Sequence, residues 1–289
     1  MTDEHIQNEK QGAHCIWDAN QPWRQGSIIS GDLAVSLGIL TEHTSKRFLI
    51  VATHDCDCVT GEDEEPQLEL IIGKEIEKDE FDGNFTLAKS TRRLHLEIEQ
   101  HGTYIELSSI NKANVDKTVL LGRVPSPNLT INTDQRRVFR RWLAARYERV
   151  SFPDELVRRL KPVADQFKKA SKKDGANVIG IYIEFEPDEE LKSESLEPYS
   201  FKISVVFDSS KAGASDAAKR IAKSIEAKFI SEFRIVDTIT GLHWNNIELE
   251  SCSVRSDVDF TLQEALSSYV FRLDDISLKL GEDGQIPLQ

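Results

Sequence analysis

The chain has 289 residues, enough for two ordinary domains or one large domain with an embellishment. Its composition, 39% hydrophobic and 29% charged, is typical of a globular protein and excludes a largely disordered one. The formal net charge of −13 excludes attraction of the whole surface to nucleic acid or to an anionic membrane, because like charges repel.

The sequence also predicts where the protein works. No apolar stretch approaches the roughly 20 residues that cross a bilayer, so no membrane partner is expected. Met1 to Gln11 is polar and lacks the apolar centre of a signal peptide. Four cysteines are too few for a disulfide scaffold, and together these features predict a cytoplasmic protein.

The front third is rich in short β-branched and aromatic runs broken by Gly, Asn and Asp, a pattern that predicts a small barrel or sandwich. His101-Gly102 provides a tight connection, so the strands on either side of it are expected to form a hairpin. The expected strands are Ser27–Ile29, Arg47–Thr53, Gln67–Ile76, Arg93–Ile98, Thr103–Leu107 and Thr118–Arg123.

Two basic helices follow. The first begins at Thr133 or Asp134, and the second runs from Pro153 to about Lys173 with a break or kink at Pro162. Residues 136–173 contain 13 Lys or Arg and four acidic residues, a net of +9, which leaves −22 on the remainder. Such segregation creates either a local site for a polyanion or an electrostatic brace between domains.

The rear half alternates strands with helices in a β-β-α-β-β-α order, which predicts an α+β sheet with helices on one face. The expected elements are strands Asn177–Phe185, Tyr199–Phe207, Phe233–Thr238 and Asn246–Val254, and helices Ala214–Phe233 and one capped by Asp259 or Thr261 that reaches about Tyr269. The predicted fold class is α+β, with a β-rich domain at 1–132, a basic helical segment at 133–175 and an α+β domain at 176–289.

The densest group of reactive side chains follows the apolar strand Phe48–Ala52. If the strand continues, one of its faces carries an imidazole and two thiols, and the other carries two carboxylates. The residues are Thr53, His54, Asp55, Cys56, Asp57 and Cys58. Three interpretations stay open: a metal site completed by His14, Cys15 or Cys252, a nucleophilic Cys with His54 or His95 as base, or a strand end with buried thiols.

Two further groups carry chemistry. In the segment Ser90 to His95, Arg93 and His95 lie on the polar face of a predicted strand. They form either a phosphate-binding site with a proton donor or a solvated surface whose positive charge neutralises nearby acidic residues. The first basic helix has Trp142 and Tyr147 among its arginines, a composition suited to nucleic acid or to domain bracing. These arginines are Arg136, Arg137, Arg140, Arg141 and Arg146.

Several familiar motifs are missing from the sequence: a phosphate-binding Gly-rich loop, a nucleophile elbow, a zinc-protease helix and a kinase set. Ser256 to Thr261 lacks the Gly and the closing Glu of a calcium loop, so Asp259 is better explained as a helix cap. No cofactor is expected, and no metal is assigned.

Two stretches of the front third resemble the small barrels of MazF/PemK-type toxins. They are Trp23-Arg24-Gln25-Gly26-Ser27-Ile28-Ile29 and Phe48-Leu49-Ile50-Val51-Ala52-Thr53, about a fifth of the chain. The first lacks the family's Asp after Gly. That family cleaves RNA without a metal, using an Arg and a hydroxyl residue, so the resemblance implies Thr53 with Arg92 or Arg93 as the analogous pair.

The whole chain also resembles a group of uncharacterised bacterial proteins, to which no established activity attaches. The likeness lies in Cys56-Asp57, Trp142 to Tyr147 and Phe152-Pro153-Asp154.

These features predict a component of a bacterial toxin or phage-defence module that binds nucleic acid at the basic helices, together with a protein partner from the same operon. One version is an enzyme that cleaves phosphodiester bonds with Thr53, His54, Asp55, Cys56, Asp57, Arg93 and His95 around the phosphate. The alternatives are a non-catalytic module that binds protein or nucleic acid, and a protein with a structural thiol–imidazole metal site. The enzyme hypothesis requires the Thr53–Cys58 segment and the arginine helices to border one cleft.

Overall fold

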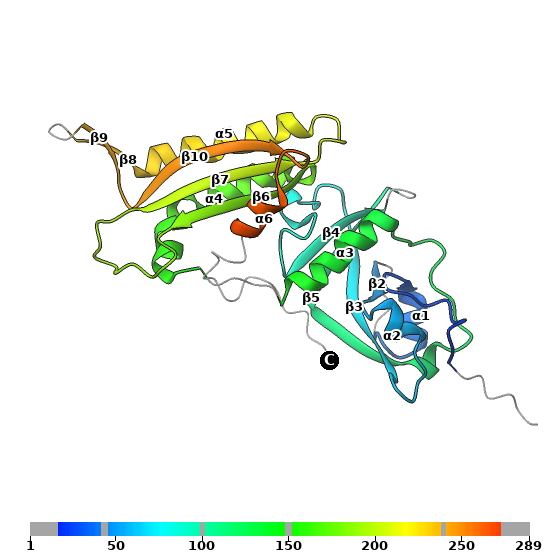
Figure 1. Cartoon of the computed structure of the whole chain (residues 1–289). Helices are drawn as coiled ribbons and strands as arrows, with labels where there is room; N and C mark the ends of the chain where they lie inside the picture. Colours follow the sequence, from blue (N-terminus) through cyan, green and yellow to red (C-terminus); the bar gives the residue numbers. More distant parts are fainter. Residues whose placement is uncertain (1–16, 42–45, 99–101, 148–151, 238–240, 273–289) are drawn as a thin grey trace, which may run out of the picture. The chain divides into compact units, whose positions relative to one another are not determined.

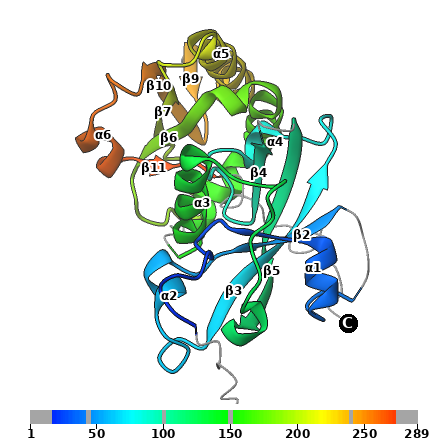
Figure 2. The ribbon, with the colours of Figure 1, turned by 90° about the vertical axis from the view of Figure 1, so that its right-hand side faces the viewer.

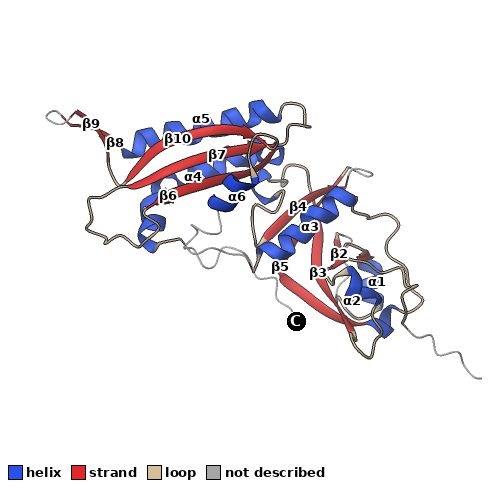
Figure 3. Cartoon of the chain, in the orientation of Figure 1, coloured by secondary structure: helices blue, strands red, loops and turns tan. Residues whose placement is uncertain are grey.

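A computed structural model describes residues 17–41, 46–98, 102–147, 152–237 and 241–272. The chain is an α+β protein, as predicted, with helices and strands in each of two compact units (Figures 1 and 3). The first unit comprises Met1–Ile71 and Lys112–Thr130, and the second comprises Ile72–Asn111 and Ile131–Gln289. This division differs from the expected domains 1–132, 133–175 and 176–289.

One sheet has five strands in the order β1-β2-β3-β5-β4, and its strands β3 and β5 contribute residues to both units. The strands are β1 (Ile28–Ser30), β2 (Arg47–Val51), β3 (Gln67–Ile76), β4 (Arg93–Ile98) and β5 (Thr103–Asp116). β1 pairs with β2, and β4 with β5, both antiparallel. The β4–β5 pairing confirms the expected hairpin, although its His101 lies outside the described residues. The described strands form an open sheet and do not close into the expected barrel.

The first unit also contains short helices, of which the first contacts β1 and β2. The helices are α1 (Gly31–Ser36), α2 (Asp55–Val59) and the 3-10 turn η2 (Lys117–Leu120). Trp17, Trp23 and Phe48 are among the buried side chains of its core. Two expectations are wrong here. β2 ends at Val51 rather than Thr53, and the strand predicted at 118–123 does not form, since 118–120 belong to the turn η2, which buries Leu120.

The second unit contains a four-stranded sheet in the order β10-β7-β6-β11. Its strands are β6 (Val178–Glu186), β7 (Tyr199–Phe207), β10 (Ile247–Ser256) and β11 (Tyr269–Val270). β6 pairs antiparallel with β7, and β7 parallel with β10. Helices α4 (Asp154–Asp174) and α5 (Ala214–Phe233) lie on one face of this sheet (Figures 1 and 2). The expectation of helices on one face is met by α5, but its companion there is α4 and not the expected C-terminal helix.

The periodicity of the sequence explains which sides of α4 and α5 are buried. Side chains three and four residues apart share a face of a helix, so each apolar stripe turns toward the sheet. α4 contributes Leu156, Leu160, Val163 and Phe167 to the core, and α5 contributes Ala218, Ile221, Ile225 and Phe229. The alternate residues of β6 and β7 that point toward the helices are equally apolar.

Pro162 does not divide the second basic helix, so of the expected break or kink the break does not occur. α4 is one helix of 21 residues, and Pro162 lies on its exposed side. A proline inside a helix removes one hydrogen bond and crowds the preceding turn. On either side of Pro162, Leu160 and Val163 are fully buried, so core packing holds the helix through this defect.

The remaining elements of the second unit are α3 (Thr133–Ala145), α6 (Leu262–Ser267), η1 (Gly83–Phe85), η3 (Gly175–Asn177), β8 (Arg234–Asp237) and β9 (Gly241–Trp244). α3 begins where predicted and has an Asn132–Gln135 capping box. Thr261, not Asp259, caps α6, which ends before the expected Tyr269 because Tyr269 pairs with β6 as part of β11. Strand β9 was not predicted. Among the described residues, no helix combines the length and the apolar character that a bilayer span requires.

The backbones of η1 and η3 meet at two glycines. A Cβ on Gly83 would lie 2.5 Å from Ser171 O, and one on Gly175 would lie 2.8 Å from Gly83 O. Beside them, the buried Lys89 Nζ donates to Thr86 Oγ1 at 2.9 Å, to Gly175 O at 2.5 Å and to Val178 O at 3.0 Å. Burial lowers the pKa of Lys89 to about 7, yet three acceptors match the three N–H donors of an ammonium group.

We expect Gly83→Ala to lower the free energy of unfolding by about 1–3 kcal/mol, because the added methyl group meets backbone that cannot rotate away. Denaturant unfolding followed by circular dichroism measures this. Gly61→Ala is the matched control: no atom lies within 4 Å of its Cβ position, and like Gly83 it has no positive φ. Equal stability of the two variants would contradict the close approach of η1 and η3.

Candidate functional site

The segment after β2 turns into a helix instead of continuing as a strand. His54 is the N-cap of α2, and its Nδ1 accepts a hydrogen bond from Cys56 N at 3.3 Å. Thr53 Oγ1 accepts from Glu69 N at 2.6 Å. The expected extended face with an imidazole and two thiols is therefore wrong, because local capping of the helix defeats the alternation of a strand.

The two thiols of α2 have different environments. Cys58 is fully buried, and its Sγ donates to Thr53 O at 3.4 Å. Burial, reinforced by Asp55, raises the pKa of Cys58 to about 12, so this thiol does not become a thiolate near neutral pH. Cys56 is exposed. Within the described ranges no three His, Cys, Asp or Glu side chains are placed to share a metal ion, and the candidate ligands His14 and Cys15 lie outside those ranges.

Other residues of the first unit hold α2 in place. Asp55 Oδ1 accepts from Gln25 N at 2.8 Å. Trp17 Nε1 donates to Cys58 O at 2.8 Å, and the buried Lys117 Nζ donates to Asp57 O at 2.7 Å and to Thr60 O at 2.9 Å. Burial lowers the pKa of Lys117. Most of the expected catalytic residues here thus have structural hydrogen bonds, and the side chains of Cys56 and Asp57 remain exposed.

Arg93 and His95 lie in the second unit, in an ionic cluster in which His95 is buried and Arg93 is partly exposed. His95 Nδ1 accepts from Asp82 N at 3.1 Å, so its proton is on Nε2, which donates to Glu106 Oε2 at 3.0 Å. Phe81 and Phe85 cover the His95 ring. Arg93 stacks over Phe85 at 4.4 Å, and its Nη1 lies 3.8 Å from Glu106 Oε2. The polar side chains of β4 are therefore less exposed to solvent than the alternation of polar and apolar residues in this strand predicts.

Glu106 is the centre of this cluster. Burial by itself raises its pKa, but the hydrogen bond from His95 and the charge of Lys74, 3.1 Å away, lower the pKa to about 2. The carboxylate stays charged and holds His95, Lys74 and Arg93 together. Lys74 and Glu106 were missed in the sequence, although the hairpin register, which sets His95 opposite Glu106, would have identified the carboxylate.

The arginines of α3 do not share one environment. Phe139, Trp142 and Ala145 are buried, which leaves Arg137, Arg140 and Arg141 together on the exposed side of the helix. Arg137 pairs with Asp134 at 3.1 Å. Arg136 is half-buried, and Arg146 Nη1 donates to Ser109 Oγ at 2.6 Å. Tyr147, one residue further, is 81% exposed.

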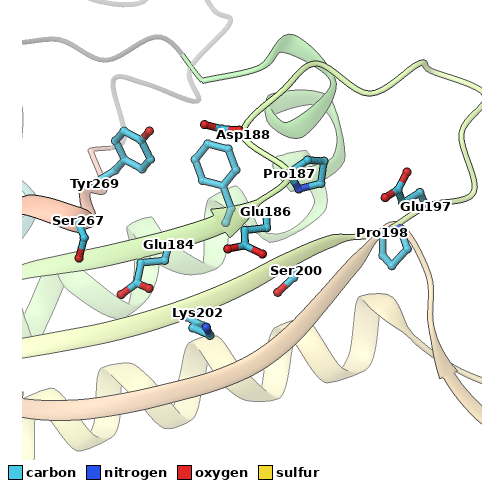
Figure 4. A pocket seen from close by; sticks show the side chains of 11 residues that line it. Glu184, Glu186, Pro187, Asp188, Glu197, Pro198, Ser200, Lys202, Ser267 and Tyr269 are labelled. Atoms are coloured by element: carbon cyan, nitrogen blue, oxygen red, sulfur yellow. The ribbon is translucent and has the colours of Figure 1, made fainter. Parts of the chain in front are cut away.

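The second unit also has an open hollow of about 750 Å³ on the sheet face opposite α4 and α5 (Figure 4). Its lining is acidic, with Glu184, Glu186, Asp188 and Glu197 beside Lys202. Lys202 is held by Glu250 at 3.2 Å. A polyanion is repelled from such a surface, so this hollow and the arginines of α3 suit ligands of opposite charge.

The chain has no significant match among protein-family models, curated proteins or solved structures. The resemblance to MazF/PemK toxins therefore stays a prediction. The shared cleft stays a prediction as well, since Thr53–Cys58 belongs to the first unit and α3 to the second, and each unit is described by itself.

Glu106→Gln should destabilise the second unit by about 1–3 kcal/mol at pH 7, because it removes a partly buried carboxylate that accepts hydrogen bonds from His95 and from the charged Lys74. The pKa of Glu106 is lowered on folding, so its contribution is complete above about pH 4.5 and is lost as the pH falls toward 2. Urea unfolding at several pH values should show the gap between wild type and variant closing in that window. Glu248→Gln, at an exposed glutamate of β10, should show no gap.

A thiol-labelling experiment tests the nucleophile hypothesis. At pH 8, iodoacetamide should modify Cys56 in the native protein and leave Cys58 unmodified until urea is added, because Cys58 is buried with a pKa of about 12. Peptide mapping identifies the labelled thiol, with Cys56→Ser as the control. Rapid native labelling of Cys58 would contradict the buried placement.

Proposed function

We propose that this protein is a nucleic-acid-binding module whose contact surface is the exposed side of α3. The observation that carries the proposal is the convergence of Arg137, Arg140 and Arg141 on one side of a helix whose opposite side is buried. Core packing thus keeps these three arginines on the exposed side of the helix. The net charge of −13 does not oppose local binding, because the acidic residues are concentrated elsewhere in the chain.

The chemistry of this surface favours single-stranded nucleic acid. Arginine presents a planar fork of donors that matches two phosphate oxygens at once. Tyr147 follows the helix, is 81% exposed, and donates its backbone N–H to Ala144 O at 2.9 Å. Unpaired bases stack on exposed aromatic rings beside such basic surfaces. The arginines would hold the backbone, and Tyr147 would stack on a base.

Binding without chemistry is preferred to catalysis because the hydrogen bonds of the expected catalytic residues serve the fold. Thr53 and Asp55 accept backbone N–H groups, and His95 is enclosed between Phe81 and Phe85. Cleavage of the bound strand is the second candidate, favoured only by the exposed Cys56 and Asp57. Membership of a toxin or phage-defence module, with a partner from the same operon, is proposed on the sequence resemblance alone.

Arg140→Gln/Arg141→Gln should weaken binding to a fluorescein-labelled 20-nucleotide RNA of mixed sequence. Each lost phosphate contact lowers the slope of log K against log salt by about 0.7 for single strands, so the slope should fall by roughly 1 to 1.5. Fluorescence anisotropy between 50 and 200 mM NaCl measures it.

The matched control is Lys192→Gln/Lys202→Gln, which removes the same charge from the acidic connection between β6 and β7 and from the lining of the acidic hollow. An equal effect of both pairs would contradict a specific role for α3. The same samples, run on a denaturing gel with Asp57→Ala beside wild type, detect cleavage. An intact RNA in every lane would eliminate the enzyme candidate.

A further inference from the structure

The exposed side of α4 carries five lysines, Lys161, Lys168, Lys169, Lys172 and Lys173, here called the lysine stripe. The opposite side of the helix is the apolar stripe that packs on the sheet, so the lysines cannot turn inward. In the part of the chain that the structure describes, none of the five forms an ion pair. Asp165 is the one acidic side chain among them on this side.

Helix geometry aligns three of the five lysines of the stripe along the axis of α4. At about 100° per residue, Lys161, Lys168 and Lys172 fall within about 40° of one another around the axis. At about 1.5 Å per residue they span roughly 16 Å along it. A duplex carries one negative charge per about 1.7 Å of its axis with both strands counted, so a duplex segment of this length carries roughly ten phosphate charges, and the stripe faces those on its side.

The neighbouring helix α5 shows that an excess of unpaired positive charge is not a general property of the helices on this face of the sheet. On α5, Lys219 pairs with Asp216 and Lys228 with Glu232, while Arg220 pairs with Asp174 at the end of α4. The other face of the sheet is acidic, with Glu184, Glu186 and Glu250 pointing away from the helices. A polyanion would therefore approach this layer from the side of α4.

We propose that the lysine stripe binds the phosphate backbone of double-stranded nucleic acid without reading its sequence. It is a second surface, separate from α3, and it rests on the proposed function only for the class of ligand. Lysine ammonium groups are point charges that contact phosphates, whereas base recognition needs side chains that reach into a groove or stack. None of the exposed side chains of α4 is aromatic, so the stripe lacks a platform for unpaired bases.

An anionic membrane is the other polyanionic surface that lysines attract, and α4 lacks what that role requires. Helices that lie on membranes insert large apolar side chains beside their basic residues. All the large apolar side chains of α4 belong to the buried stripe, and none is exposed. The duplex is therefore the better partner.

The experiment compares Lys161→Gln/Lys168→Gln/Lys172→Gln with a matched triple, Lys192→Gln/Lys202→Gln/Lys211→Gln, in the full chain. Glutamine keeps the helix propensity and removes only charge. The probes are two fluorescein-labelled 24-bp duplexes of unrelated sequence, titrated from 50 to 200 mM NaCl. Thermal unfolding confirms that both variants fold, and Lys169→Gln/Lys173→Gln gives a second, independent variant.

The α4 triple variant should bind roughly fivefold more weakly per lysine removed near 0.15 M salt, equally for both duplexes. The slope of log K against log salt concentration should fall by about 2 to 3. The control triple should lose little, and the α4 triple should still bind single-stranded RNA through α3. Equal duplex binding by the two triples would overturn the inference and leave the α3 proposal standing. Binding to phosphatidylserine–phosphatidylcholine vesicles but to neither duplex would overturn it in favour of a membrane. Wild type that binds no nucleic acid would remove both proposals.

Discussion

The packing of α4 and α5 onto a single face of the β10-β7-β6-β11 sheet decides the chemistry of both outer surfaces of that layer. Phe167 contacts Phe229 at a ring separation of 5.9 Å, and Phe201 stacks on Phe229 at 5.7 Å, so both helices and the sheet share one core. Burying these rings removes apolar area from water, the main force that holds the layer together. As a consequence the lysines of α4 face solvent, and the carboxylates of β6 remain on the open face.

Buried cations stabilise particular connections in each unit, and backbone carbonyl groups provide most of their acceptors. Arg159 is almost fully enclosed. It pairs with Glu155 at 2.6 Å and donates to Ser195 O, Glu197 O and Asn246 O, which holds the acidic segment after β6. Lys89 and Lys117 act similarly at η3 and α2. A buried charge is tolerated only when its hydrogen bonds are satisfied, so these residues are determinants of structure and not spare catalytic groups.

The predicted catalytic residues and the predicted binding residues differ in the same way, since the former have structural hydrogen bonds and the latter are exposed. Residues expected to do chemistry, such as Thr53, Asp55 and His95, are engaged in hydrogen bonds with backbone or neighbouring side chains. Residues expected to bind, such as Arg137 and Arg141, keep exposed positions because their helix buries its other side. Attraction to phosphates needs only oriented charge at a surface, whereas catalysis needs groups held at a reacting atom. The structure therefore supports binding more strongly than chemistry.

The sequence by itself determined the α+β class and four elements to the residue (β3, β4, β7 and α5). These follow from local periodicity, which side-chain chemistry records directly. Tertiary structure alone decided that α4 continues through Pro162, that His54–Val59 forms a capped helix instead of a strand end, and that His95 is enclosed opposite Glu106. Each of these depends on contacts between residues distant in the chain or on a competition between cap and strand, and neither leaves a periodic signal.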